Sequence, residues 1–110
     1  MKKQYFLNAN IIDTHNSLNE VGGLIIGDNG LVEAIGKKVN KNNIPSREKV
    51  IDLKGKYIFP GIVDMRVFVG EPGYEYKENF RTLSNAALSG GVTSVVTMPN
   101  TDPIIDNVSI

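Results

Sequence analysis

The sequence predicts an α/β fold in which a small antiparallel β unit precedes a strand–helix–strand unit. In the first half of the chain, short runs of apolar and β-branched residues alternate with polar turns, which is typical of antiparallel sheets. In the second half, two such runs flank a stretch with helical spacing, which is the pattern of a right-handed parallel unit. We place the boundary near residue 58, so the predicted domains are residues 1–58 and 59–110.

Four short strands are expected in the first half, at residues 5–12, 23–27, 31–35 and 50–53. Asp28-Asn29-Gly30 separates the second from the third, and Asn-Gly suits the type I′ turn that follows the twist of paired strands. A tight hairpin is therefore predicted there. Residues 37–49 are polar and are expected to form a surface loop, and residues 54–56 to form a second turn.

The first predicted strand of the second half covers residues 62–69, a β-branched run too short for a buried helix and expected to be covered on both faces. Side chains alternate along a strand, so Asp64, Arg66 and Phe68 are predicted to share one face. A stiff turn at residues 71–73 would then place a loop at the carboxyl end of this strand.

Apolar residues recur at three-and-four spacing between residues 76 and 89, which predicts an amphipathic helix that Gly90-Gly91 would end. Residues 92–98 form the next predicted strand. Near the end of the chain, Asp106 is a candidate N-cap for a further helix. His15 lies in a polar turn and is expected to be a surface histidine.

Composition excludes several classes of function. The chain has 110 residues, 41% of them hydrophobic, and a formal net charge of zero. Its lysines and arginines are scattered, so no basic footprint for nucleic acid or an anionic membrane is present. There is no cysteine, which excludes disulfides and thiolate metal sites. No secretion signal or membrane-spanning stretch is recognisable, and a cytoplasmic protein is expected.

The blocks FPGIVDM, EPGYEYKE and MPNTDPIIDN, in this order, resemble the long-chain bacterial dihydroorotases of the amidohydrolase superfamily of metal-dependent hydrolases. The resemblance implies a (β/α)8 barrel of the TIM type, preceded by a small antiparallel β-sandwich. Such a barrel needs about 250 residues, so we expect the chain to be an N-terminal fragment with a partial sandwich and a truncated barrel. Allantoinases, hydantoinases and dihydropyrimidinases remain open, although GYEYKE and MPNTDP favour dihydroorotase.

The resemblance also implies positions for a metal and substrate site. In that family the first barrel strand carries a His-x-His pair that binds zinc, and a nearby arginine and an asparagine hold the substrate carboxylate. The two histidine positions are Arg66 and Phe68 in this sequence, the arginine position is Gly70, and the asparagine position is Asn100. Asn100 is thus the one substrate-binding candidate, with a cap on its own loop as the other role open to it. No catalytic residue or metal ligand is assigned in this chain, and no cofactor is expected.

These replacements are chemically severe. A guanidinium has no lone pair to donate and a phenyl ring has no ligand atom, so neither can bind zinc. We expect the Arg66 guanidinium to pair with Asp64, with an anion-binding role in a remodelled pocket as the alternative, and Phe68 to fill the core. Glu71 is either a loop tether or a carboxylate that supports the site.

Two hypotheses for function follow. The first is an inactive dihydroorotase homologue, a pseudoenzyme of de novo pyrimidine biosynthesis that assembles with aspartate carbamoyltransferase, and with itself, as a structural or regulatory subunit. The second is an active metal-dependent cyclic amidohydrolase, whose zinc ligands would all come from later strands. A decayed gene product without a function is a third, weaker alternative.

Overall fold

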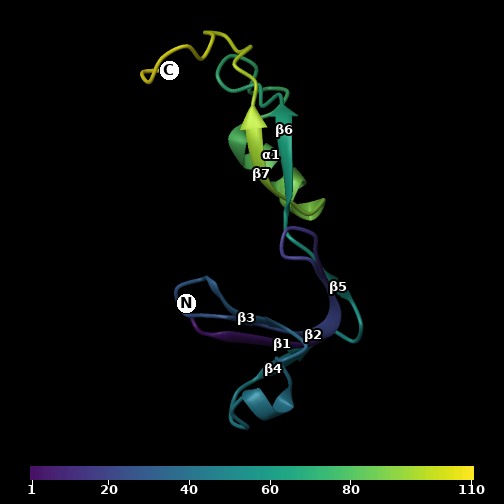
Figure 1. Ribbon diagram of the computed structural model, residues 1–110. Helices are drawn as coiled ribbons and strands as arrows, with labels where there is room; N and C mark the ends of the chain where they lie inside the picture. The colour runs from purple at the N-terminus through teal and green to yellow at the C-terminus, as the bar shows by residue number, and fades with distance from the viewer. The chain divides into compact units, whose positions relative to one another are not determined.

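The computed structural model describes residues 1–110, which divide into two compact units, Met1–Pro60 and Gly61–Ile110 (Figure 1). The division lies two residues beyond the expected boundary. Each unit has its own sheet, and they are described separately.

The first unit is a single five-stranded sheet. Its strands pair in the order β3-β2-β1-β4, and β5 also pairs with β1. Their bounds are β1 (Gln4–Asp13), β2 (Leu18–Ile26), β3 (Val32–Gly36), β4 (Val50–Asp52) and β5 (Tyr57–Ile58). β2 runs antiparallel to β1 and β3, whereas β4 and β5 run parallel to β1. The expectation of a purely antiparallel unit is therefore wrong, because the long connection after β3 returns the chain beside β1 in the same direction.

That connection also contributes to the core. Tyr5, Leu7, Ala9 and Ile11 alternate along β1 and are buried, as the two-residue period of a strand requires. Val39 and Ile44 pack in the same cluster as Tyr5 and Leu7. Residues 37–49 are thus not only a surface loop. The 3₁₀ helix η1 (Lys41–Asn43) lies within this segment and is capped by the Asn40 side chain, which accepts from Asn42 N at 2.9 Å.

The β2–β3 hairpin is confirmed, but its turn differs from the predicted type. Gly30 N donates to Gly27 O at 3.0 Å and Gly27 N to Leu31 O at 2.8 Å. Gly30 has a φ of 79°, and Asn29 is not among the residues with positive φ. A type I′ turn needs positive φ at both central positions, so this is instead a three-residue loop with glycine in the left-handed position. The turn at residues 54–56 does have that geometry, since Lys54 and Gly55 have φ values of 51° and 81°.

A bulge in β1 holds this second turn in place. The register of β1 against β2 shifts between Phe6 and Ala9, and Asn8 has a φ of 58°. Asn8 Nδ2 donates to Asp52 Oδ1 at 2.9 Å, and Gly55 N donates to the Asn8 carbonyl oxygen at 2.7 Å. The uninterrupted strand predicted over residues 5–12 therefore has a kink, which the asparagine tolerates because its side chain binds locally.

The Asp52 carboxylate makes stability depend on pH. Hydrogen bonds from the Asn8 side chain, first, and from Lys54 N hold the pKa of Asp52 below its usual value of 3.8. A carboxylate whose folded-state pKa is lowered adds stability that is present above its unfolded-state pKa and lost as the pH falls through the folded-state value.

We therefore expect Asp52→Asn to reduce the acid sensitivity of the full-length protein. The measurement compares urea unfolding midpoints at neutral pH with those at acidic pH below 3.8. Asp28→Asn is the matched control, because the Asp28 carboxylate is exposed and accepts no hydrogen bond in the structure. Equal acid sensitivity in the two variants would contradict the prediction.

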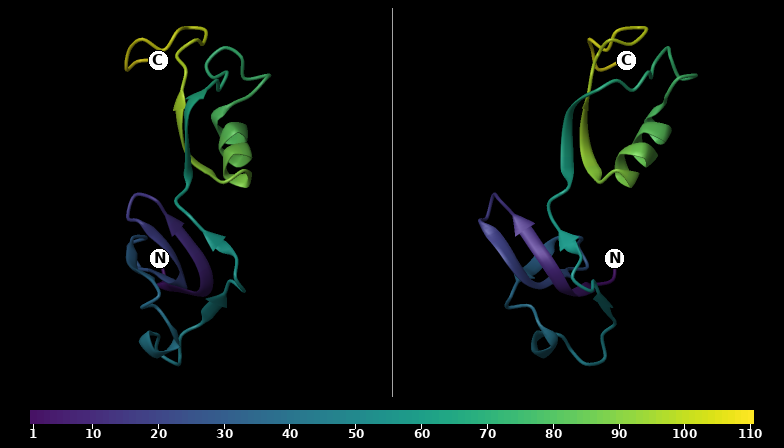
Figure 2. Two further views of the ribbon diagram at one scale, coloured as in Figure 1. Left: turned by 45° about the vertical axis from the view of Figure 1, so that its right-hand side comes forward. Right: turned by 90° about the vertical axis from the view of Figure 1, so that its right-hand side faces the viewer.

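The second unit is a strand–helix–strand unit, as predicted (Figure 2). β6 (Ile62–Val67) and β7 (Val92–Thr97) pair in parallel, and α1 (Phe80–Ser89) connects them and lies beside β7. α1 is the chain's only α-helix and, at ten residues, is too short to cross a bilayer.

The helix begins four residues later than predicted because of a capping box. Asn79 Oδ1 accepts from Thr82 N, and Thr82 Oγ1 accepts from Asn79 N, each at 3.0 Å. This reciprocal pair satisfies two backbone donors at the helix start. The helix predicted to begin at Asp106 is absent. Asn107 instead forms a short turn, since its side chain accepts from Ser109 N at 2.9 Å.

β6 is not covered on both faces within these residues. Val63 is 57% exposed and Met65 is 76% exposed, and Ile62 is exposed as well. The expectation of a strand buried on two sides is wrong for this chain. A two-stranded sheet with one short helix beside it cannot enclose an apolar strand.

Candidate functional site

The candidate site is formed by two loops at the carboxyl ends of β6 and β7, residues 68–79 and 98–105. Ligand sites of parallel α/β folds lie at this end of the strands. Asp102 N donates to the Pro72 carbonyl oxygen at 3.1 Å, so the two loops are bonded to each other. Phe68, Gly70 and Asn100 lie on these loops, and Arg66 lies one residue before the end of β6.

Arg66 does not pair with Asp64 through its guanidinium, and this expectation is wrong. Asp64 Oδ1 instead accepts a hydrogen bond from the backbone N–H of Arg66 at 3.1 Å. The chain's ion pair lies elsewhere, between Lys3 and Glu33. The Arg66 side chain is exposed and keeps its full positive charge at the end of β6.

The same hydrogen bond disturbs the alternation of β6. Asp64 pairs with Val95 and Val67 with Thr97, so three steps on β6 match two steps on β7. Because Val95 and Thr97 lie on one face of their strand, the intervening part of β6 holds one extra residue. The prediction that Asp64, Arg66 and Phe68 share one face through strict alternation is therefore wrong. The Asp64 carboxylate accepts from the Arg66 N–H, which would otherwise be free to pair with the neighbouring strand.

Phe68 is 39% exposed, so its interpretation as core filler is wrong for this chain. Its ring lies 6.1 Å from that of Tyr74, at an interplanar angle of 54°, and the Lys77 ammonium lies 5.3 Å from the centre of the Tyr74 ring. These are ordinary aromatic and cation–π contacts. Phe68 thus anchors the loop that follows β6 and offers no atom to a metal.

Gly70 is buried and has a φ of 78°, a left-handed conformation that disfavours other residues. A Cβ atom there would lie 2.9 Å from the Glu78 carbonyl oxygen and 3.0 Å from that of Tyr74. Tyr74 N donates to Gly70 O at 2.6 Å and closes the turn. The position that carries arginine in the family is therefore closed to any side chain in this backbone conformation.

Glu71 tethers the loop to the helix. Its Oε2 accepts from Phe80 N at 2.9 Å, and this is the first backbone N–H of α1. A carboxylate at a helix N-terminus satisfies a free donor and complements the helix dipole. Of the two roles left open by the sequence, the loop tether is the one in the structure.

Asn100 is exposed and its side chain forms no hydrogen bond within the chain. Its neighbour Thr101 is only 5% exposed, and its Oγ1 donates to the carbonyl oxygens of Pro103 at 2.9 Å and Pro99 at 3.3 Å. Thr101 fixes the shape of this loop through these two bonds, and no pattern in the sequence marked it as a site residue. No hydrogen bond joins Asn100 to Arg66, Phe68 or Gly70.

The residues at the histidine positions do not fit a zinc ion. A protonated guanidinium repels a cation and a phenyl ring cannot coordinate one. Nowhere in residues 1–110 do three or more His, Cys, Asp or Glu side chains gather closely enough to hold a metal. His15 lies on the surface, as predicted, and its backbone N–H bonds to Asp13 Oδ1 at 3.1 Å.

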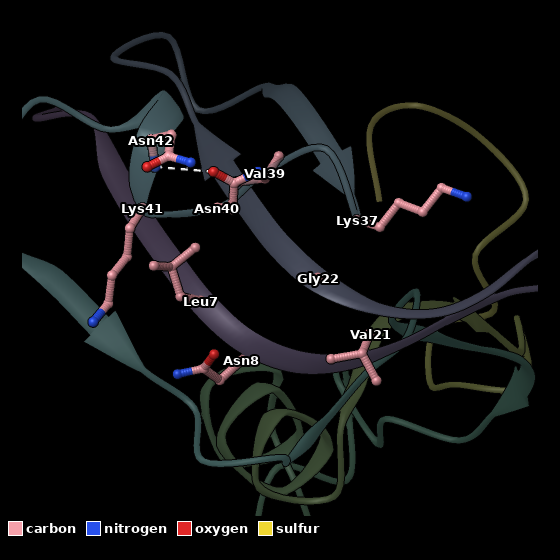
Figure 3. Close-up of a pocket in the computed structure, with 9 residues that line it drawn as sticks. All are labelled: Leu7, Asn8, Val21, Gly22, Lys37, Val39, Asn40, Lys41 and Asn42. Atoms are coloured by element: carbon pink, nitrogen blue, oxygen red, sulfur yellow. Dashed lines mark hydrogen bonds between the residues drawn. The ribbon is translucent and has the colours of Figure 1, made fainter.

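An open groove in the first unit has a volume of about 370 Å³ (Figure 3). Asparagine, lysine and small apolar side chains line it, among them Asn8, Lys37 and Lys41. It contains no carboxylate or histidine, and its only ionisable side chains are Lys37 and Lys41, so it lacks the paired acid and base of a hydrolytic site. The loops after β6 and β7 remain the candidate site.

A glycine substitution tests how tightly these loops are joined. A Cβ atom at Gly73, whose φ is 100°, would collide with the Asp102 carbonyl oxygen. We expect Gly73→Ala to destabilise the full-length protein by clearly more than the roughly 1–2 kcal/mol of left-handed strain alone. Gly91→Ala is the matched control, because Gly91 has a φ of 83° and open space around it. Similar losses in urea unfolding of the two variants would contradict the close loop contact.

Comparison with known proteins identifies the family. A family model described as dihydro-orotase-like matches residues 55–109. The dihydroorotase of Chlorobaculum tepidum is 45% identical over 102 residues, which cover 93% of this chain and 23% of that protein. The dihydroorotase of Ehrlichia canis is 38% identical over 104 residues, with coverage of 94% and 23%.

The dihydroorotase of Carboxydothermus hydrogenoformans is 42% identical over 86 residues, which cover 78% of this chain and 19% of that protein. The chain therefore spans about a quarter of the length of the curated relatives that it matches. With half of its residues in the family model and this degree of identity, the chain belongs to the dihydroorotase-like family.

Proposed function

We propose that the protein is a catalytically inactive dihydroorotase homologue of de novo pyrimidine biosynthesis, which acts as a structural or regulatory subunit with aspartate carbamoyltransferase. The observation that carries this proposal is the presence of Arg66 and Phe68 at the end of β6, where the family resemblance calls for two histidines. The curated relatives carry the name dihydroorotase, which supports the pathway.

The chemical argument rests on the metal. Bound zinc lowers the pKa of a water to about 7, which raises the fraction of hydroxide at neutral pH by on the order of 10⁸. Arg66 and Phe68 cannot contribute to that effect, and the positive charge of Arg66 opposes it. Substrate binding is weakened as well. The backbone around Gly70 leaves no room for the arginine that would bind a substrate carboxylate.

We further propose that residues 59–110 are the first strand–helix–strand unit of a TIM-type barrel and that residues 1–58 are part of a β-sandwich. The parallel pairing of β6 and β7 supports the barrel, as do the apolar side chains that β6 leaves uncovered. The mixed sheet of the first unit would be one layer of the sandwich.

The alternative function is that of an active enzyme. Asn100 retains the residue type that the resemblance assigns to substrate binding, and its amide is exposed and without a partner in the chain. In this case the full-length protein is an active zinc-dependent dihydroorotase or related cyclic amidohydrolase. All of its metal ligands then lie beyond residue 110.

A turnover assay separates the two functions. We expect the purified full-length protein to hydrolyse dihydroorotate no faster than buffer does, with or without added zinc. The Chlorobaculum tepidum dihydroorotase, assayed in parallel, controls for the assay conditions. Zinc-dependent turnover comparable to that of the control would overturn the proposed inactivity.

A second experiment tests the partner. The full-length protein is mixed with aspartate carbamoyltransferase from the same organism and analysed by size-exclusion chromatography with light scattering. We expect a complex of defined mass, and a change in the activity of the carbamoyltransferase. Separate elution at micromolar concentrations would refute the subunit role while leaving the inactivity untouched.

A further inference from the structure

Asn29 and Gly30 lie at the tip of the β2–β3 hairpin, and residues 28–31 are all exposed. No other asparagine of the chain is followed by glycine. We propose that Asn29 is a site of spontaneous deamidation, with water as the co-reactant, and that the product weakens this hairpin. The proposal is independent of the family's chemistry.

The nucleophile is the backbone nitrogen of Gly30. Glycine has no Cβ atom, so nothing on residue 30 shields this nitrogen from the side chain of Asn29. Gly30 N donates to the Gly27 carbonyl oxygen at 3.0 Å, and this bond must open before attack. Exposed backbone bonds at loop tips open at little free-energy cost, so the bond slows the reaction only slightly.

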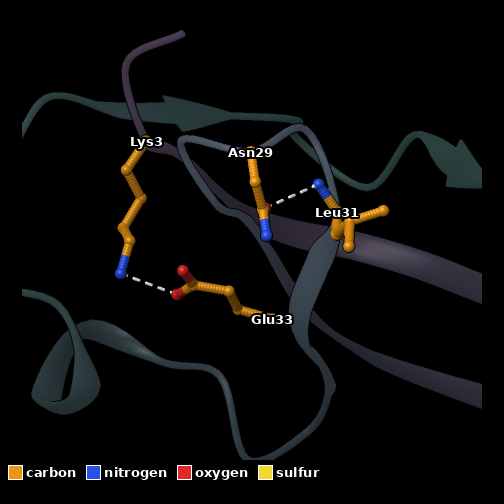
Figure 4. A network of polar contacts seen from close by, with 4 residues as sticks. All are labelled: Lys3, Asn29, Leu31 and Glu33. Carbon is orange, nitrogen blue, oxygen red and sulfur yellow. Dashed lines mark hydrogen bonds and ion pairs between the residues drawn. The ribbon is translucent and has the colours of Figure 1, made fainter.

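A hydrogen-bond donor also lies where negative charge develops during the attack on Asn29. Leu31 N donates to Asn29 Oδ1 at 3.0 Å (Figure 4). Attack on Asn29 Cγ places negative charge on this same oxygen in the tetrahedral intermediate. A donor already aimed at that oxygen stabilises the charge, as the donors of an oxyanion hole do.

The reaction balances with water alone. Gly30 N gives its proton to a base in the solvent and forms a bond to Asn29 Cγ. The bond from Cγ to Nδ2 then breaks, and the nitrogen leaves as ammonia after taking a proton from the solvent. Water next opens the cyclic imide at either of its two carbonyl groups. The products are aspartate and isoaspartate at position 29.

Either product changes the hairpin. A Cβ atom built at Gly27 would lie 2.6 Å from Glu33 Oε1 and 2.9 Å from Asn29 Oδ1, so these two oxygens flank one small space. Deamidation places a second negative charge in that space, where Glu33 is already paired with Lys3 (Figure 4). Isoaspartate also lengthens the main chain inside the loop that the bond between Gly27 N and Leu31 O closes.

The test uses the folded full-length protein, incubated at mildly alkaline pH and sampled over time by peptide mass mapping. Asn16 is the internal comparison, since it lies in the exposed β1–β2 turn and is followed by Ser17. We expect Asn29 to deamidate at least about tenfold faster than Asn16, which corresponds to a barrier lower by about 1.4 kcal/mol. A rate at Asn29 no higher than at Asn16 would overturn the proposal.

Two variants complete the test. Asn29→Gln keeps Gly30 but lengthens the side chain, so the five-membered imide cannot form, and we expect no deamidation at position 29. Deamidation of that glutamine at the original rate would refute the mechanism. Asn29→Asp imitates one product, and we expect faster hydrogen exchange at the Gly27 amide. Unchanged exchange would refute the effect on the hairpin.

Discussion

Histidines at positions 66 and 68 of the full-length protein are expected to raise its affinity for zinc above that of the unaltered sequence. Arg66→His with Phe68→His removes a fixed positive charge and supplies two imidazoles at the end of β6. We expect zinc to bind at least about a hundredfold more tightly than to the unaltered protein, which is about 2.8 kcal/mol. Isothermal titration calorimetry with zinc measures this change.

The matched control is Val63→His with Met65→His. These residues have the same two-residue spacing and are 57% and 76% exposed, but both lie within β6, before its end. We expect little gain in zinc affinity there. Equal zinc binding by the two double variants would show that any histidine pair with this spacing suffices, and the significance given to positions 66 and 68 would be lost.

Addition of Gly70→Arg to the first pair is expected to cost stability rather than restore substrate binding. The left-handed φ of 78° strains any other residue by roughly 1–2 kcal/mol, and the carbonyl oxygens of Tyr74 and Glu78 crowd its Cβ. The loop between β6 and α1 has its own conformation, and a single arginine does not rebuild it.

The second large effect concerns the isolated chain of 110 residues. β6 and β7 form a two-stranded sheet with two open edges, and Val63, Met65 and Val96 are more than half exposed. Bare edges and contiguous apolar surface favour aggregation, and so small a sheet is only marginally stable. We expect this chain to aggregate or to unfold without a cooperative transition.

Light scattering and circular dichroism on the isolated chain check this expectation, with the full-length protein as the reference. A monomer at low concentration that melts sharply and refolds on cooling would contradict it. In that case the chain would be stable by itself, and the barrel proposed around β6 and β7 would lose its main structural support.

Patterns in the sequence predicted the elements whose signals are local. The β-branched runs at residues 62–69 and 92–98 became β6 and β7, and Gly90 ended α1 as expected. The start of α1 was missed although its signal is present, because Asn79 and Thr82 have the spacing of a capping box. The spacing of apolar residues continues into the turn before α1, so this spacing alone predicts a helix that begins too early.

The errors arose where a side chain bonds to the backbone or where segments distant in sequence pair. Asn8 kinks β1 because it bonds to Asp52, a contact across 44 residues that no local pattern reveals. Asp64 bonds to Arg66 N and breaks the strand alternation used to orient Arg66. Val39 and Ile44 looked like isolated apolar residues in a polar loop, and only tertiary packing makes them part of the core.

The four candidate site positions were assigned from the sequence, but the contacts of these residues were not. Chemistry alone shows that a guanidinium and a phenyl ring cannot bind zinc, and this conclusion does not depend on packing. Whether position 70 could accept a side chain does depend on packing, because it follows from the carbonyl oxygens of Tyr74 and Glu78 around Gly70. Sequence spacing carries no information about that space.

The most direct test of a silenced metal centre is the zinc content of the unaltered full-length protein. The protein is purified without chelators, dialysed against a zinc-containing buffer, desalted and analysed by inductively coupled plasma mass spectrometry. We predict far less than one equivalent of zinc, with the Chlorobaculum tepidum dihydroorotase treated identically as the reference. Tightly held zinc at a full equivalent or more per chain would contradict it.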